Sequence, residues 1–350
     1  MKTLKVEFGE CNYPLFIGSD VVERFAELVG LYRFPDDTAI ILEEGSSAQF
    51  IPGSDSFVKI KLPGDTRLSS FDALSEFLAA IPWAQVNSGF TLIAAGDRPL
   101  LNLASFSCAL MSHSPVLVLV PTTFWGMIEC GVRFRNSLGW KNRHSAMSVS
   151  GWPKMALLDL NSLQNTDEDE IFLLLASLYR NLLLSNPERF IHFESTWQKI
   201  GLESGGLIID ALEEICKVRK AILSRGGEEQ FLLEDFGIRA LKTCEAAKKR
   251  PLERREMASL IFLELRWRLK LANELKIGDA EVIGRNLLVI EKVLAAHQVK
   301  QKEWDTARDR LLQSLEPEML NDIHLPKAVG ATQKIGEIDR AVGENCLIDC

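Results

Sequence analysis

The chain has 350 residues, of which 47% are hydrophobic, and its 40 basic and 48 acidic side chains give a formal net charge of −8. This acidic balance argues against nucleic acid as a partner, and the length favours two domains rather than one. Since no window approaches the roughly 18 consecutive apolar residues of a membrane span, and residues 1–10 lack the apolar run of a signal peptide, we expect a cytoplasmic protein that does not bind membranes.

Residues 1–160 alternate between short β-rich runs and helical patterns. The apolar runs are nearly continuous, as in VLVLV at residues 116–120, which is typical of strands buried on both faces of a parallel sheet. The sequence therefore predicts an N-terminal doubly wound, Rossmann-like α/β domain. The expected strands are 3–8, 38–42, 57–62, 91–94 and 116–120, and the expected helices are 20–29, 69–81 and 100–111.

The turn after the fourth predicted strand reads AAGDRPLLNLASF, residues 94–106. In doubly wound sheets, ligands bind beyond the C-terminal ends of the strands, where glycines let backbone N–H groups approach a phosphate at a helix N-terminus. Here the side chain of Arg98 blocks such a close approach, and the carboxylate of Asp97 would face a doubly charged pyrophosphate. The turn is therefore a weakened phosphate cradle.

A second polar turn, Pro121-Thr122-Thr123, follows the last predicted strand. Taken alone, it is a proline-led turn with a hydroxyl cap for the next helix, which is a common arrangement. These three residues by themselves indicate no function.

Beyond Leu160, apolar residues recur at three- and four-residue spacing, which indicates amphipathic helices and an all-helical second domain. The expected domains are residues 1–160 and 161–325, followed by a partly ordered tail of residues 326–350. The expected helices are 168–184, 207–223, 232–248, 252–275, 280–297 and 300–314.

The seven cysteines are scattered without a C-x-x-C pair, so neither a disulfide framework nor a zinc ribbon is indicated. Most are expected to be small core residues. Cys346 and Cys350 form the closest pair, and we expect them to be exposed because they lie in the tail.

Residues 236–256 read FGIRALKTCEAAKKRPLERRE, a predicted helix, a break and the start of a second helix. This frame resembles the segment of the dehydroquinate synthase family in which Phe-Gly-His-Thr-x-Gly-His-Ala-x-Glu is followed by His-Gly-Glu. Phe236, Gly237, Glu245 and Glu256 match it without a gap. The Pro-Thr-Thr of residues 121–123 also matches, and further positions follow in register up to about Gly278. The resemblance implies the family's fold, a Rossmann-like α/β domain followed by a helical domain.

The resemblance also implies a catalytic zinc or cobalt, which the family holds with one carboxylate and two histidines. This chain has Ser177, Ile238 and Arg254 at those three positions, and Lys242 at the position of a further histidine. Its five histidines are dispersed along the chain. We therefore expect no metal centre and no conversion of the family's sugar-acid phosphate to dehydroquinate.

The family's dinucleotide loop is only partly kept. Of its glycine-rich pattern only Gly96 and Phe106 match, while Glu43 and Gly45 replace residues on the adenosine side, and Pro63-Gly64-Asp65 stands for its Pro-Gly-Glu. We expect NAD to bind weakly or not at all. By resemblance, the positions that would contact it are Gly96, Asp97, Asn102, Thr122 and Thr123.

Charged and polar residues at other matching positions are the remaining candidates for function. The candidate catalytic positions are Glu129, Lys141, Asn142, Arg180, Lys217 and Lys242, and the candidate anion-binding set is Arg135, Lys141, Arg180, Lys217 and Arg254. If the fold is kept, the basic set would converge between the domains and bind a phosphorylated or carboxylated ligand. Alternatively, Arg254 and the other basic residues pair internally with Glu129 and Glu245, because buried arginines are rarely left without a carboxylate.

Two interpretations of the function follow. The favoured one is a catalytically silent relative that acts as a binding or scaffolding subunit, with a protein partner or an anionic small molecule. The alternative is a metal-independent enzyme acting on a phosphorylated or carboxylated sugar. The resemblance also implies a homodimer built through the N-terminal domain.

Overall fold

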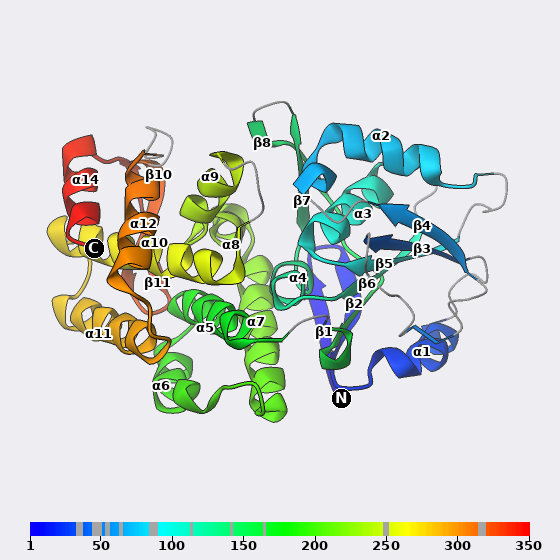
Figure 1. Ribbon diagram of the computed structural model, residues 1–350, viewed down its shortest axis with the longest axis horizontal. Helices are drawn as coiled ribbons and strands as arrows, with labels where there is room; N and C mark the ends of the chain where they lie inside the picture. Colours follow the sequence, from blue (N-terminus) through cyan, green and yellow to red (C-terminus); the bar gives the residue numbers. More distant parts are fainter. Residues whose placement is uncertain are drawn as a thin grey trace. The chain divides into compact units, whose positions relative to one another are not determined.

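The computed structural model describes residues 1–32, 38–43, 51–52, 57–62, 66–83, 90–112, 115–140, 143–163, 166–247, 252–313 and 320–350. The chain forms two compact units, Met1–Thr166 with Leu212–Ser224, and Asp167–Ala211 with Arg225–Cys350 (Figure 1). Helix α7 (Gly205–Arg225) therefore contributes residues to both units. None of the described helices is long and apolar enough to cross a membrane.

The first unit is built on a seven-stranded sheet of order β1-β2-β9-β6-β5-β3-β4. Its strands are β1 (Lys2–Phe8), β2 (Cys11–Gly18), β3 (Thr38–Glu43), β4 (Val58–Leu62), β5 (Thr91–Gly96), β6 (Val116–Pro121) and β9 (Met155–Asp159). Strands β1 and β2 are antiparallel, whereas every other neighbouring pair is parallel. The predicted doubly wound α/β fold is confirmed, and the antiparallel edge is an addition that the sequence analysis did not predict.

Both faces of this sheet are covered, which explains the continuous apolar runs. On one face, alternate residues of β5, β6 and β9 pack against Val22, Phe25 and Leu28, which belong to a short 3₁₀ helix (Val22–Arg24) and to α1 (Phe25–Tyr32). The other face contacts α3 (Arg98–Leu110), which also packs against α2 (Phe71–Ala80) and α4 (Phe124–Cys130). A separate antiparallel pair, β7 (Arg135–Trp140) and β8 (Arg143–Ser150), follows α4.

The second unit is centred on two long helices, α5 (Glu168–Leu183) and α10 (Arg254–Glu274), which pack along each other. The rings of Phe172 and Phe262 stack between them with centroids 5.6 Å apart. Around them lie α6 (Pro187–Thr196), α8 (Leu232–Asp235), α9 (Arg239–Ala247), α11 (Ala280–Ala296), α12 (Gln301–Gln313), β10 (Asn321–Ala328), β11 (Ala331–Glu337) and α14 (Arg340–Ile348). The expectation of an all-helical domain was therefore incomplete, because β10 and β11 form an antiparallel hairpin.

The helix predicted over residues 232–248 is broken into α8 and α9. Gly237 lies at the break with a φ of +72°, in the left-handed region that glycine enters without strain. A Cβ at this position would stand 2.7 Å from the side chain of Leu265, so both the backbone conformation and the close packing require glycine. The match of Gly237 to the family frame thus has a local structural cause.

The prediction of a partly ordered tail from residue 326 is wrong. The end of the chain forms β10, β11 and α14, and the side chain of Leu347 is fully buried. Two indole groups hold this segment, since Trp267 Nε1 donates to the carbonyl of Gly343 and Trp304 Nε1 to that of Cys350. Cys346 and Cys350 are buried as well, which corrects the expectation that they are exposed.

Candidate functional site

The three positions that the resemblance assigns to a metal lie in the second unit, in α5, between α8 and α9, and at the start of α10. Ser177 is fully buried and its Oγ has no hydrogen-bond partner among the described residues. Ile238 is apolar and 2% exposed, and Arg254 carries only hydrogen-bond donors. In the described part of the chain, no group of three or more His, Cys, Asp or Glu side chains could hold a metal ion. The side chains at these positions therefore do not fit a zinc or cobalt ion.

Arg254 is bonded to a carboxylate. Its Nε donates to Oε1 of Glu170 at 2.8 Å, and the two side chains are 25% and 7% exposed. As the first residue of α10, Arg254 puts a positive charge at the positive end of the helix dipole, and the carboxylate of Glu170 offsets that repulsion. The expectation of internal pairing did not name Glu170, and Glu129, one of the two carboxylates that it named, pairs with Arg219 instead.

Glu170 is a functional candidate that the sequence analysis missed. It stands seven residues before Ser177, about two helical turns, so the two residues share one face of α5. The acidic cluster in the first turn of α5 reads as ordinary compensation of the helix dipole, and only the structure brings one of its members to Arg254.

Arg180 is a structural residue. It is fully buried in α5, and its guanidinium donates to the backbone carbonyls of Leu233 and Phe236, which lie just before the Gly237 break. Lys242 likewise donates from Nζ to a backbone carbonyl, that of Glu234. Both side chains hold the segment between α8 and α9 by bonds to its backbone.

The predicted phosphate cradle lies at the N-terminus of α3 in the first unit. Asp97 is the N-cap of this helix, and its Oδ1 accepts both the backbone N–H of Arg98, at 2.7 Å, and the hydroxyl of Thr123. A protein carboxylate therefore occupies the helix end where a pyrophosphate would need free N–H groups. The guanidinium of Arg98 lies over the indole ring of Trp125, with 5.9 Å between Cζ and the ring centroid. The residues at this turn do not fit the phosphates of NAD.

The other predicted cofactor positions have structural roles as well. The amide of Asn102 is bonded twice to the backbone of Ser137 in β7, with Nδ2 donating at 2.7 Å and Oδ1 accepting at 3.1 Å. Thr122 donates its backbone N–H to the carbonyl of Gly96, and Thr123 caps α4 by accepting the N–H of Gly126. The structure thus brings Gly96, Asp97 and the two threonines together, as expected for adjacent strand ends. Hydrogen bonds join Thr122 to Gly96 and Thr123 to Asp97.

Glu129 belongs to a buried ion pair within the first unit. Its Oε1 lies 3.0 Å from Nη1 of Arg219, with side chains 8% and 2% exposed, and Arg219 Nε also donates to the carbonyl of Val132. The sequence analysis missed Arg219, which lies 90 positions further along the chain, in α7. The pair fixes the end of α4 against α7, so Glu129 has a structural partner.

The remaining basic candidates in the described residues, Lys217 and Arg135, form an ion pair and a hydrogen bond with side chains of the first unit. Lys217 Nζ pairs with Oε1 of Glu213 at 2.6 Å, and Lys2 pairs with the other oxygen of that carboxylate. Burial alone would raise the pKa of Glu213, but the hydrogen bonds from Lys2 and Lys217 outweigh it and lower the pKa. Arg135 donates from Nη2 to Oγ of Ser148.

Several expectations lie outside the described residues, namely Gly45, Pro63-Gly64-Asp65, Lys141, Asn142 and the side chain of Glu43. Of the predicted anion-binding set, Arg135 and Lys217 belong to the first unit, and Arg180 and Arg254 to the second. Their convergence on one ligand stays a prediction.

No protein-family model matches the chain. Among curated proteins, the chain is similar to the 3-dehydroquinate synthases of Brucella suis and Brucella ovis, with 24% identity over 236 residues. The matched part covers 65% of this chain and 62% of the length of those relatives.

Solved structures show the same fold. The crystal structure of a 2-deoxy-scyllo-inosose synthase complexed with carbaglucose-6-phosphate, NAD⁺ and Co²⁺ aligns over 99% of both chains, with a TM-score of 0.81 and 13% identity. A 2-epi-5-epi-valiolone synthase from Streptomyces hygroscopicus, with NAD⁺ and Zn²⁺ bound, aligns over 98% of both chains, with a TM-score of 0.73 and 16% identity. Sequence and fold thus point to the same group of proteins.

Proposed function

Since the chain belongs to the dehydroquinate synthase family of sugar phosphate cyclases, we propose that it is a catalytically silent member that uses the fold for binding rather than for cyclisation. The observation that carries this proposal is the ion pair between Arg254 and Glu170. It places a permanent cation where the family resemblance requires a metal ligand. A guanidinium has no lone pair to offer a metal, and its charge repels one.

The electrostatics of this pair support the loss of the metal. A divalent cation about 4 Å from the guanidinium would be repelled by roughly 8 kcal/mol, because unit charges at that distance interact by about 4 kcal/mol near a protein surface. Glu170 offers a single negative charge against the three positive charges of Arg254 and a divalent ion, and its Oε1 already accepts a hydrogen bond from Arg254. The local charge is balanced by the pair itself.

The cap of α3 supports the loss of NAD-dependent chemistry. The carboxylate of Asp97 and the phosphates of a dinucleotide carry the same sign and would compete for the same helix end. We propose that the protein does not bind NAD tightly. Calorimetry with NAD separates this from the alternative of a repurposed redox cyclase, which requires the dinucleotide.

The direct test is the metal content of the purified protein and of a variant that restores the ligand set. Elemental analysis after dialysis against zinc or cobalt is expected to find no stoichiometric metal in the natural protein. The triple variant Ser177→Glu, Ile238→His, Arg254→His is expected to bind one ion per chain, and Arg254→His alone, as the matched control, to bind none. One tightly bound ion in the natural protein, or turnover of the sugar-acid phosphate that a chelator abolishes, would overturn the proposal.

We also propose that a second copy of the chain is a partner, through the first unit, on the basis of the family resemblance. A dimer has a mass of 2 × 39.2 = 78.4 kDa. Light scattering at micromolar concentration tests this, and a single species of 39.2 kDa would contradict it.

A further inference from the structure

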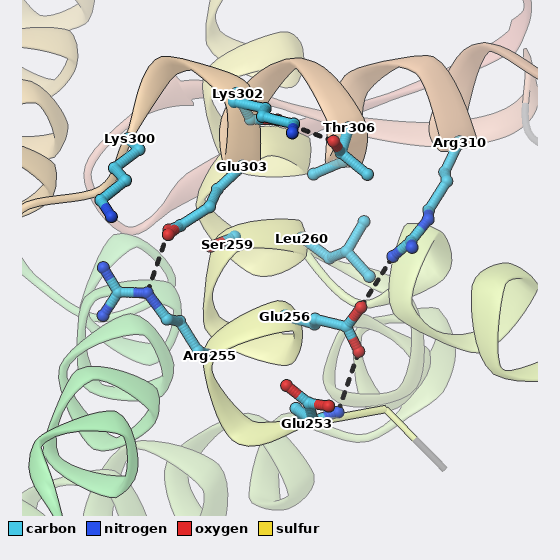
Figure 2. A pocket seen from close by; sticks show the side chains of 11 residues that line it. Glu253, Arg255, Glu256, Ser259, Leu260, Lys300, Lys302, Glu303, Thr306 and Arg310 are labelled. Carbon is cyan, nitrogen blue, oxygen red and sulfur yellow. Dashed lines mark hydrogen bonds and ion pairs between the residues drawn. The ribbon is translucent and has the colours of Figure 1, made fainter. Parts of the chain in front are cut away.

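The second unit contains a cavity of about 360 Å³ between α10 and α12. Figure 2 shows it with α12 on one side and the first turns of α10 on the other. Glu256, Ser259 and Leu260 line it from α10, whereas Arg254 bonds to Glu170 of α5 and is not among its lining residues. The cavity is therefore separate from the positions that the family resemblance assigns to the metal.

The charged side chains that line the cavity carry an excess of positive charge. Four of them are basic and three are acidic: Arg255, Lys300, Lys302 and Arg310, against Glu253, Glu256 and Glu303.

Two of the acidic side chains form ion pairs across the cavity. Arg255 Nε lies 3.0 Å from Glu303 Oε2, and Arg310 Nη1 lies 2.8 Å from Glu256 Oε1, as the dashed lines in Figure 2 show. Glu253 is the N-cap of α10, where the positive end of the helix dipole compensates its carboxylate.

Lys300 and Lys302 supply the remaining positive charge. Lys300 comes just before α12 and Lys302 lies in its first turn, and both side chains are exposed. Within the described part of the chain, neither side-chain amine takes part in an ion pair or hydrogen bond. These two amines can therefore accept an anion without first breaking a bond to a described residue.

The floor of the cavity is apolar. Leu260 and Ala307 are 1% and 7% exposed, and Ser259 beside them is 4% exposed and carries a hydroxyl. Most of the other lining residues are charged, which suits a charged ligand, and the volume lies within the range of about 300–1,000 Å³ found for small-molecule sites.

We propose that this cavity binds a small organic anion of sugar size, a phosphate monoester or a carboxylate. The anionic group lies at the amine of Lys300, which Figure 2 shows beside Arg255, while Lys302 adds positive charge further along α12, and the carbon skeleton packs on Leu260 and Ala307. Arg255 and Arg310, held in place by their glutamates, add positive potential without being the primary contacts. The proposal stands on the cavity alone and is independent of whether the protein has lost its catalysis.

The test is binding of two probes, inorganic phosphate and glucose 6-phosphate, measured by calorimetry on the full chain, with glucose as the neutral comparison. Glucose 6-phosphate is expected to bind more tightly than phosphate, and glucose not to bind at a matched concentration. Removing both amines in Lys300→Gln/Lys302→Gln is expected to weaken the binding of both anions at least tenfold, since the loss of one hydrogen bond to a charged group already corresponds to about a factor of ten or more. The matched control is Lys292→Gln, an exposed lysine of α11 that does not line the cavity.

A second variant tests the interior of the cavity separately from the lysines at its edge. Thr306 is exposed on α12 and lines the cavity, so Thr306→Trp fills the cavity without changing a charge. It is expected to abolish the advantage of glucose 6-phosphate over phosphate while circular dichroism stays unchanged. Absence of binding by the natural protein at millimolar probe, or equal losses in the Lys292 variant and the double variant, would overturn the proposal, because weak attraction to any surface lysine then accounts for the data.

Discussion

The starts of α3 and α10 are two places where the family resemblance implies a bound group, and each now holds a side chain of that group's charge. At α3 the carboxylate of Asp97 occupies the helix end where a pyrophosphate would bind. At α10 the guanidinium of Arg254 stands at a position assigned to the ligand of a cation. In both places the protein supplies internally the charge that a ligand would bring. The local electrostatics at both helix starts are therefore balanced by side chains of the protein itself, as the proposed loss of these ligands requires.

The two substitutions differ in depth. The partner of Arg254, Glu170, is 7% exposed, whereas Asp97 and Thr123 are only partly buried. Removing one member of a buried pair leaves a charge that water cannot reach. Water can, by contrast, take the place of a partly buried carboxylate such as that of Asp97. The two regions should therefore respond very differently to mutation.

The largest effect is expected from Arg254→Leu. This change leaves the nearly buried carboxylate of Glu170 without Arg254, so the free energy of unfolding should fall by about 2–3 kcal/mol. Urea unfolding followed by circular dichroism measures it.

The control for this change is Arg285→Leu, which breaks the bond of Arg285 to Glu194, where the arginine is 55% exposed. A loss of less than about 1 kcal/mol is expected there. The double variant Arg254→Leu/Glu170→Leu should recover most of the stability, because both charges are then gone. If Arg254→Leu loses no more stability than Arg285→Leu, the ion pair with Glu170 does not balance the charge at the start of α10. That result would contradict the role given to the pair here.

A smaller effect is expected from Asp97→Ala, which removes the cap of α3 and should cost about 1 kcal/mol. Asp97→Asn keeps a capping oxygen while removing the charge, so it should lose less stability. The same variant sharpens the comparison functionally, because removal of the carboxylate should raise the affinity for inorganic phosphate or NAD above that of the natural protein. Unchanged affinity in calorimetry would show that the carboxylate is not what keeps anions from this helix end.

The sequence predicted the sheet unit through its apolar runs, because strands buried on both faces need residues such as those of β5 and β6 along their whole length. It did not predict β2 or β9, since β2 contains Pro14 and β9 reads MALLD, without a β-branched or aromatic residue. It also missed the hairpin β10–β11, whose first strand is interrupted by Pro326.

For the site, the sequence told which residue types stand at the family's positions but not what they contact. The bond from Arg254 to Glu170 joins residues 84 positions apart, and that from Arg219 to Glu129 joins residues 90 apart. Such pairs depend on how whole helices are placed, so local pattern and spacing carry no signal for them. By contrast, Glu264 and Arg268, fully buried on α10, are four residues apart, as are Glu213 and Lys217 on α7, and the sequence could have pointed to pairs with this spacing.

The smallest effect is a pH dependence near the start of α10. His297 stacks on Phe172 with ring centroids 4.8 Å apart, and its carbonyl accepts a hydrogen bond from Arg255. Burial lowers the pKa of His297, and although Glu168 opposes this shift, Arg255 adds to it. The folded protein therefore resists protonation at this residue, while in the unfolded chain a histidine takes up a proton near pH 6.5.

It follows that the stability contributed by His297 is fully present above about pH 6.5 and falls as the pH drops through that value toward the lower folded pKa. His297→Gln should flatten this part of the pH profile, whereas His192→Gln, an exposed histidine of α6, should leave it unchanged. Urea midpoints at about pH 7.5 and 5.5 measure the difference, which should be smaller than the loss in Arg254→Leu because the imidazole is only partly buried. A steeper profile in His297→Gln would reverse the sign of the argument. It would mean that the charged imidazole stabilises the junction of α5, α10 and α12 and that the positive charge of Arg254 and Arg255 there is already more than balanced.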